Sequence, residues 1–374
     1  MKITFAIKAL GHEGGGAERV LVDVASGLAA RGHSVAIVTG DAAGFAAFYP
    51  LDQRVDLIGV GVRPVGGKSS VYDMVRRIWS FRRAIRALRP DVVVGFMHST
   101  YVPLGLALKG GGVPMVASEH IGPEHYQDRL LERFALSLTP LIAASITVVS
   151  EQIRSSFGGW LRTRMEVVPN PVSLGPASHV RSRQEREGEP VAATLLCVGR
   201  LAPQKGHAIL IEAFRLVVGK FPGWRLRIVG EGELRGMLQE LVDSRGLNAQ
   251  VCLAGAVSDI GSEYAAADLF VLPSSYESFG LATAEALLHG LPAVGFADCP
   301  GTNDLIRDGE NGRLVRGDDR IQALADVLED LMRDPAERAR LGRSSRAWIV
   351  ARYGIEGVLD KWESVLLDAS SRSR

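Results

Sequence analysis

The sequence predicts an α/β protein made of two consecutive domains, each built on a parallel β-sheet. Short apolar runs alternate with helix-length amphipathic stretches along most of the 374 residues, which is the pattern of strand–helix–strand units. The 42 glycines agree with the many tight turns that such units need. A stretch rich in proline and charge interrupts this alternation over residues 171–190 and predicts an interdomain linker.

The first domain is expected over residues 1–170. A helix is predicted over 17–30, where apolar residues recur at helical spacing and Gly32 can cap the C-terminal end. A second helix is predicted over 74–89. Apolar runs predict strands at 3–7, 34–39, 91–96, 115–118 and 145–149.

The second domain is expected over residues 191–350, where the pattern restarts. Helices are predicted over 206–218 and 234–244 and from about residue 280. A last helix-prone stretch, 355–367, lies in the C-terminal segment 351–374. Strands are predicted at 194–198, 225–229, 251–253, 269–272 and 293–296. Two parallel-sheet domains joined by a linker leave a cleft between them, which is a usual place for ligands.

Composition excludes several classes of protein. The 43 basic and 42 acidic residues nearly cancel, so no overall field favours nucleic acid. Three widely spaced cysteines, Cys197, Cys252 and Cys299, favour reduced core thiols in the cytosol. No apolar run reaches the roughly 18 residues that would span a bilayer. The glycine cluster near the N-terminus argues against a signal peptide, so a cytoplasmic protein is expected.

The strongest candidate site follows two strands of the second domain. In "CVGRLAPQKGH", Arg200 and Lys205 leave the carboxyl end of a strand, the end that faces the crevice of a parallel sheet. A guanidinium and an ammonium at this spacing suit a diphosphate, whose charge must be neutralised as it leaves. Taken alone, the pair is better explained as two solvated loop charges.

A second motif, "YESFGLATAEALLHG", strengthens the diphosphate interpretation. Its helix is expected to begin near Gly280, where the free amides of Gly280, Leu281 and Ala282 form an anion site. Glu277 precedes this helix and can face the cleft, while Glu285 can reach a hydroxylated group such as a ribose. The alternatives are a capping carboxylate for Glu277 and a solvated helix face for Glu285.

The first domain opens with a glycine-rich loop, "GHEGGGAER", that lets backbone amides approach an anionic ligand. It is not a dinucleotide fingerprint, because Arg19 stands at the third glycine position. Asp41 resembles the ribose-binding acid of a dehydrogenase, and a tight strand-to-helix turn also explains the loop. His120 and His98 each follow a strand, where a histidine binds a sugar hydroxyl or is simply structural.

Two further features concern metals and membranes. No Asp-x-Asp motif and no H-x-x-x-H spacing occur, so no metal site is expected. The helix over 74–89 has an apolar stripe and no acidic residue, which suits either an anionic membrane surface or an ordinary surface helix. Its basic residues are Arg76, Arg77, Arg82, Arg83, Arg86 and Arg89.

Together these motifs resemble the retaining glycosyltransferases of family 4, which have the GT-B fold of two Rossmann-like domains facing across a cleft. The resemblance runs along nearly the whole chain and in order. It comprises "GGGAER", "SEH", "VVPNPV", "GRLAPQKG", "IVGEGELR", "LFVLPSSYESFGLATAEAL", "GLPAVGF" and "DGENGRLV". It implies that the C-terminal helix crosses back to the first domain.

The resemblance also implies a role for each candidate residue. A nucleotide-sugar donor would be held by Arg200 and Lys205 at the diphosphate, by Glu277 at the sugar and by Glu285 at the ribose. Gly15 and Gly16 would approach the diphosphate from the first domain, and His120 would lie beside the donor sugar. The reaction would keep the anomeric configuration and need no metal or other cofactor.

The resemblance leaves the substrates open. Many relatives have a proline where this chain reads Phe279-Gly280-Leu281, and a Gly-Pro-x-Glu motif where it reads Gly301-Thr302-Asn303-Asp304. The "GGAER" and "SEH" motifs look most like enzymes that extend lipid-linked or cell-surface glycans with UDP-hexoses or UDP-N-acetylhexosamines, and GDP-mannose is the second choice. The other classes considered are a non-catalytic sugar-nucleotide-binding subunit and a nucleotide-dependent oxidoreductase.

Overall fold

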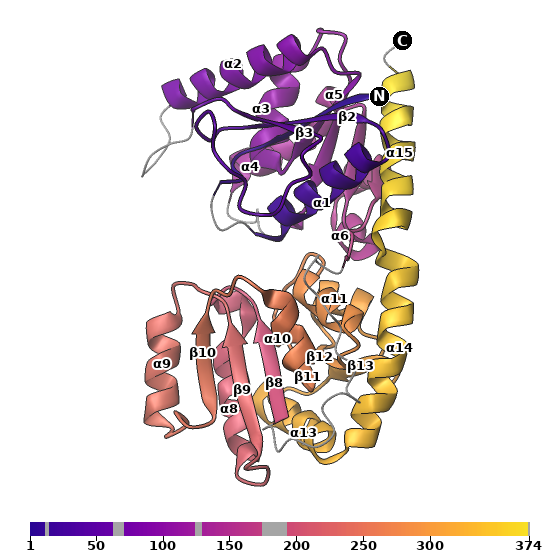
Figure 1. Ribbon diagram of the computed structural model, residues 1–374. Coiled ribbons are helices and arrows are strands. Elements are labelled where there is room, and N and C mark those ends of the chain that lie inside the picture. Colours follow the sequence, from indigo (N-terminus) through magenta and orange to yellow (C-terminus); the bar gives the residue numbers. More distant parts are fainter. Residues whose placement is uncertain (12–14, 63–70, 124–128, 174–192, 373–374) are drawn as a thin grey trace. The chain divides into compact units, whose positions relative to one another are not determined.

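The computed structural model describes residues 1–11, 15–62, 71–123, 129–173 and 193–372 (Figure 1). The chain divides into two compact units. The first unit combines Met1–Pro171 with Ile355–Arg374, and the second is Val172–Gly354. Most of the expected linker, from residue 174 onward, lies outside the described residues.

The first unit contains a parallel sheet of seven strands in the order β3-β2-β1-β4-β5-β6-β7. Its first strand is buried along five of six residues, as expected for a sheet covered on both faces. The order reverses between β1 and β4, which pair directly. The strands are β1 (Lys2–Ile7), β2 (Ser34–Thr39), β3 (Val55–Gly59), β4 (Val92–Phe96), β5 (Met115–Glu119), β6 (Ser145–Val148) and β7 (Met165–Val167).

Helices cover this sheet, and one of them comes from the far end of the sequence. α15 (Ile355–Ser371) packs against α1, β4 and β5. Its Trp362 is 2% exposed and stacks on Phe96 with ring centroids 6.0 Å apart. The expected return of the C-terminal helix is thereby confirmed. The other helices are α1 (Gly16–Ala30), α2 (Val71–Leu88), α3 (His98–Leu108), α4 (Leu130–Ser137), α5 (Thr139–Ile142), α6 (Glu151–Ser156) and α7 (Gly159–Arg162).

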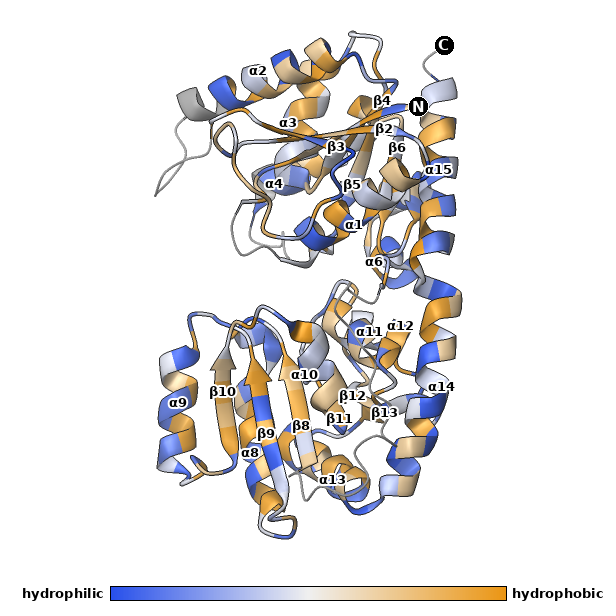
Figure 2. Cartoon of the chain, in the orientation of Figure 1, coloured by the Kyte–Doolittle hydropathy of each residue, from blue (hydrophilic) through white to orange (hydrophobic). Residues whose placement is uncertain are grey.

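The second unit contains a parallel sheet of six strands in the order β10-β9-β8-β11-β12-β13, and this order reverses between β8 and β11. Figure 2 shows β8 and β10 mostly in apolar colours, whereas the surface helix α9 alternates between polar and apolar residues. The strands are β8 (Ala193–Val198), β9 (Trp224–Val229), β10 (Val251–Gly255), β11 (Leu269–Val271), β12 (Ala293–Phe296) and β13 (Gly312–Val315).

Five of the seven α-helices assigned in this unit each connect one strand to the next, and α13 and α14 follow the last strand. A short 3-10 turn, η3 (Pro203–Lys205), precedes the first of them. The helices are α8 (His207–Val218), α9 (Arg235–Ser244), α10 (Ile260–Ala266), α11 (Leu281–Leu288), α12 (Pro300–Leu305), α13 (Arg320–Arg333) and α14 (Pro335–Tyr353).

The two parallel sheets confirm the predicted fold class. All ten predicted strands are present, with ends that shift by no more than two residues. The prediction missed β3, β7 and β13, which are three of the four outer strands and are short or interrupted by charge. Cys197 and Cys299 are buried as expected, but Cys252 is exposed. In the described part of the chain, no helix combines the length and apolarity needed to cross a bilayer.

Candidate active site

The predicted donor residues meet where the strand order of the second sheet reverses. Arg200 and Lys205 follow β8, and Glu277 follows β11, the neighbour of β8. In an open parallel sheet, crossovers leave in opposite directions at this point and open a crevice at the carboxyl ends of the strands. The topology therefore brings together residues that lie 72 positions apart in the sequence.

Lys205 and Glu277 form one ion pair. The ammonium Nζ of Lys205 donates to Oε1 of Glu277 at 2.5 Å, and the buried hydroxyl of Ser274 donates to the same oxygen at 2.6 Å. The two charged side chains are only 19% and 11% exposed. Oε2 of Glu277 accepts no hydrogen bond from the described residues. The carboxylate is thus held through one oxygen and leaves the other for a ligand.

The backbone around this pair is closely packed. Gly206, directly after Lys205, has φ of 70° and its Cα faces the carbonyl oxygen of Pro273. The amide of Ser275 donates to the carbonyl of Gln204 at 2.8 Å, which ties the Lys205 turn to the segment that carries Glu277. The left-handed conformation suits glycine, and there is no room for a Cβ at this position.

Arg200 provides a second cation, which is exposed and, within the described part of the chain, unpaired, in contrast to Lys205. Its side chain is exposed, and it has no hydrogen bond or ion pair to the residues that the structure describes. An exposed guanidinium can form two parallel hydrogen bonds with phosphate oxygens. Lys205 is therefore already paired with Glu277 through one of its three N–H donors, whereas the unpaired Arg200 can turn toward an incoming anion.

α11 begins at Leu281, four residues beyond Glu277. Gly280 caps it in a left-handed conformation with φ of 85°, and Leu281 and Ala282 form its first turn, both part-exposed. The amides of a first helical turn have no partner within the helix and carry the positive end of its dipole. The predicted anion-binding amides thus stand beside the Lys205–Glu277 pair.

Glu285, one turn further into α11, is 6% exposed, so it does not lie on a solvated helix face. The hydroxyl of Tyr264 donates to its Oε2 at 2.8 Å. The Tyr264 ring stacks on His289 with centroids 5.1 Å apart. Sequence reasoning missed Tyr264, because it contacts Glu285 from another helix and its local sequence, "SEYAAADLF", carries no motif.

His120 lies at the carboxyl end of β5 in the first unit. It is buried, stacks on Phe96 at 4.8 Å between centroids, and has its Nε2 3.0 Å from the hydroxyl of Ser118. The hydroxyl of Thr147 donates to Ser118 at 3.1 Å, so Ser118 is free to donate to Nε2 and to leave the proton of the ring on Nδ1. Burial lowers the pKa of His120 to about 4, so the ring is neutral at neutral pH.

The glycine loop of the first unit is partly described. Gly15 caps α1 and Gly16 is its first residue, and both are exposed. Residues 12–14 lie outside the described residues. Asp41 accepts a hydrogen bond from the amide of Leu10 at 2.7 Å and from that of Gly11 at 3.4 Å, so its carboxylate holds this loop.

The other candidate histidine of the first unit, His98, lies 3.3 Å from a carboxylate oxygen of Glu132.

No group of three or more His, Cys, Asp or Glu residues gathers as a metal site in the residues that the structure describes. The cationic groups beside Glu277 in the predicted donor site are Arg200, Lys205 and the first turn of α11.

A second buried histidine makes the stability of the protein depend on pH. His207 begins α8, is 1% exposed, and neither ring nitrogen has a hydrogen-bond partner among the described residues. Burial first, and then the charge of Lys205, lower its pKa to about 4.

We expect the free energy of unfolding to fall as the pH drops from about 6.5 to 4. In that window the unfolded histidine takes up a proton that the folded one refuses, which costs up to about 1.4 kcal/mol per pH unit. Urea unfolding of wild type and His207→Gln at several pH values measures this. In His207→Gln the free energy of unfolding should change less steeply with pH, by an amount that corresponds to the uptake of up to one proton. Equal pH dependence in the two proteins would contradict the prediction.

Comparisons with known proteins agree with this geometry. The family model described as Glycosyltransferase Family 4 matches residues 14–175, and the model described as Glycosyl transferases group 1 matches residues 181–348. The chain belongs to the family 4 glycosyltransferases. This membership rules out the oxidoreductase, in agreement with the structural role of Asp41.

Relatives of this family 4 glycosyltransferase match over its full length. An uncharacterized glycosyltransferase of Haemophilus influenzae is 25% identical over 98% of this chain and 99% of its own. An α-1,4-N-acetyl-D-galactosaminyltransferase of Campylobacter jejuni, named for a saccharide on PP-undecaprenol, is 26% identical over 99% of each chain. Anabaena HepE, solved with UDP and glucose, has a TM-score of 0.78 at 22% identity over 98% of this chain and 99% of its own, which shows the common fold.

Proposed function

We propose that this glycosyltransferase moves a hexose or N-acetylhexosamine from a UDP-sugar to a hydroxyl group of a glycan or lipid-linked saccharide, with retention of configuration and without a metal. The observation that carries the proposal is the Lys205–Glu277 pair beside the first turn of α11 and the exposed Arg200. Two cations and a helix start suit a diphosphate, and the carboxylate next to them suits a sugar hydroxyl.

Each residue has a part in the proposed reaction. Arg200, Lys205 and the amides of Gly280, Leu281 and Ala282 stabilise the negative charge that grows on the diphosphate as the C1–O bond breaks. The acceptor hydroxyl attacks C1 from the side of the departing phosphate, whose oxygen takes the hydroxyl proton. Retention follows because the new C1–O bond forms on the face from which the old one leaves.

The remaining residues position the donor. Oε2 of Glu277 is the acceptor for a donor-sugar hydroxyl, and Glu285, oriented by Tyr264, accepts the hydroxyls of the ribose. Gly15 and Gly16 are included in the proposal as backbone contacts to the diphosphate. His120 stays neutral and offers its Nδ1 hydrogen to the donor sugar.

Names of relatives support the choice of substrates. HepE is solved with UDP and with UDP-glucose, and the Campylobacter relative is an N-acetylgalactosaminyltransferase. A Mycolicibacterium smegmatis relative is GDP-mannose-dependent, at 28% identity over 69% of each chain, so GDP-mannose is the second choice. Lipid-linked acceptors belong to the same proposal and place the enzyme in the cytoplasm, in peripheral contact with the inner face of the cytoplasmic membrane.

A donor screen followed by product stereochemistry tests the proposal. We expect UDP and one UDP-sugar to raise the melting temperature, because a ligand that binds only the folded state stabilises it. Incubation with that donor should release UDP in the presence of EDTA, and proton NMR of the product should show the anomeric configuration of the donor. An inverted product would overturn the retaining mechanism. Donor binding without any turnover would favour the non-catalytic binding subunit instead.

A further inference from the structure

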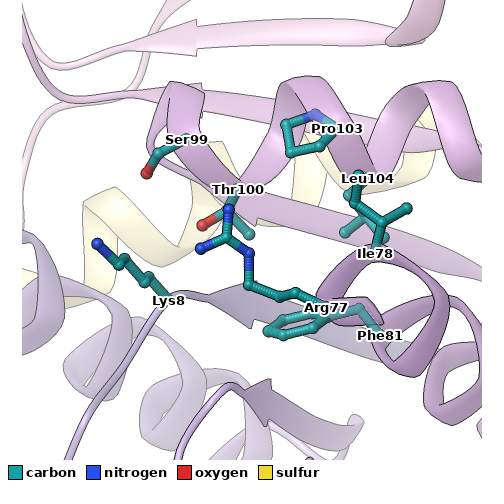
Figure 3. A pocket seen from close by; sticks show the side chains of 8 residues that line it. All are labelled: Lys8, Arg77, Ile78, Phe81, Ser99, Thr100, Pro103 and Leu104. Carbon is teal, nitrogen blue, oxygen red and sulfur yellow. The ribbon is translucent and has the colours of Figure 1, made fainter. Parts of the chain in front are cut away.

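A small cavity in the first unit collects cations and hydroxyls around one point. Figure 3 shows the cationic ends of Lys8 and Arg77 and the hydroxyls of Ser99 and Thr100 turned toward the same space. Its apolar wall is formed by Ile78, Phe81, Pro103 and Leu104. The cavity measures about 20 Å³, which admits one water molecule or one phosphate oxygen.

The topology of the sheet explains the position of this cavity. Lys8 directly follows β1, and Ser99 and Thr100 lie in the first turn of α3, which follows β4. These two strands pair where the strand order reverses, the place at which open α/β sheets bind ligands. The start of α3 adds the positive end of an 11-residue helix.

The charges in this cavity have no counterpart. None of the lining residues is acidic, and neither Lys8 nor Arg77 has an ion pair within the described part of the chain. Thr100 is only 7% exposed, and Figure 3 shows its hydroxyl turned toward the two cationic ends. Two cations without an ion pair, together with two hydroxyls, suit a ligand that carries negative oxygens.

An apolar groove adjoins the cavity between α2, α3 and α4 and shares Arg77, Ile78, Ser99 and Pro103 with it. The groove measures about 700 Å³. Large apolar side chains stand exposed along it: Val75 at 57%, Trp79 at 61% and Leu106 at 56%. Its acidic member, Glu132, is already paired with His98 and with Arg129. A hydrocarbon chain therefore meets apolar walls and no unpaired carboxylate.

We propose that the cavity and the groove together bind the acceptor as a lipid-linked saccharide, an inference that rests on the proposed function. An oxygen of its phosphate or diphosphate lies between Lys8, Arg77 and the hydroxyl of Thr100. The hydrocarbon chain follows the groove past Trp79 and Leu106. A soluble glycan has neither the anionic junction nor the apolar chain that this pair of sites fits.

The arrangement also orients the saccharide within the first unit. β5, which carries His120 at its carboxyl end, is the neighbour of β4 on the side away from β1. Strands in a sheet lie about 4.8 Å apart, so the anion site stands only one or two strand spacings from the His120 position. A sugar attached to the bound phosphate therefore extends along the same edge toward His120.

Calorimetric titration of the full chain with farnesyl diphosphate tests the inference. Saturating UDP is present throughout, so that the diphosphate of the probe does not occupy the donor site. We expect farnesyl diphosphate to bind, and farnesol and inorganic diphosphate each to bind at least about tenfold more weakly. The reason is that each lacks half of the contacts.

Two matched pairs of variants locate the site. Arg77→Gln should weaken binding by about tenfold or more, whereas Arg86→Gln, the same change on the same helix but outside both cavities, should not. Leu106→Ser should weaken it as well, whereas Leu367→Ser on α15, also 56% exposed, should not. Melting temperature and UDP affinity show whether each variant is folded.

Three results would overturn the inference: no binding of farnesyl diphosphate, equal losses for Arg77→Gln and Arg86→Gln, or equal losses for the two leucine variants. Equal arginine losses would mean that α2 attracts anions without a defined site. Release of UDP from a UDP-sugar, measured separately, decides the proposed function. Turnover without farnesyl diphosphate binding would overturn only the lipid-linked acceptor.

Discussion

Replacing Glu277 by glutamine is expected to lower kcat by at least about 10²-fold while the protein stays folded. The amide still accepts the Ser274 hydrogen bond but removes the charge that faces Lys205 at 2.5 Å, so both the lysine and the oxygen offered to the donor sugar change. UDP carries no sugar and should still bind. Steady-state release of UDP from the preferred UDP-sugar measures the effect.

Glu310→Gln is the matched control for this experiment. Glu310 is also an ion-paired glutamate of the second unit, 2.9 Å from Arg307, but it is 60% exposed and lies on the surface. Loss of the Glu310 charge should leave turnover unchanged, because exposed ion pairs contribute little to the stability of the fold. Wild-type turnover in Glu277→Gln would remove Glu277 from the proposed mechanism.

Replacing Gly206 by alanine is expected to destabilise the second unit by roughly 2 kcal/mol or more and to lower donor affinity. The residue has φ of 70°, and an added Cβ would lie 2.2 Å from the carbonyl oxygen of Pro273. Relief of that contact must move the Lys205 turn or the segment that leads to Glu277. Urea unfolding gives the change in stability, and UDP titration gives the change in affinity.

Gly219→Ala supplies the comparison at the opposite end of α8. That glycine has φ of −61° and nothing within 4 Å of an added Cβ, so alanine should be tolerated or slightly stabilising. Equal stability of Gly206→Ala and wild type would show that the Lys205 turn tolerates displacement. The explanation of its geometry by close packing would then be wrong.

The sequence predicts every strand that lies inside the two sheets and misses three of the four at the edges. A central strand such as β4, VVVGF, is buried at every residue and reads as an unbroken apolar run. An edge strand such as β13, GRLV, is half covered and carries a charge, so it looks like a loop. β13 becomes a strand because it pairs with the neighbouring strand β12, and the local sequence carries no information about that pairing.

The candidate residues likewise fall into those that the local sequence reveals and those that only the three-dimensional structure reveals. Arg200, Lys205 and Glu277 were identifiable because each follows a recognisable strand, and the strand order then brings two of them into contact. Tyr264 and Ser274 act through contacts with the glutamates and carry no local signature. The cavity of Lys8, Arg77 and Thr100 depends on three separate segments, so only a three-dimensional arrangement reveals it.

The return of α15 to the first unit has a consequence for synthesis. Trp362 fills the space beside Phe5 and Phe96, and Arg31 pairs with three acidic residues of α15, so the core of the first unit is incomplete without this helix. The ribosome adds about 5–20 residues per second, so residues 172–374 follow on the order of ten to forty seconds after the first unit's other segments. During that interval the nascent sheet keeps an apolar face uncovered. The second unit is continuous in sequence and can close first, which makes the nascent chain a natural client for a chaperone that shields β4 and β5.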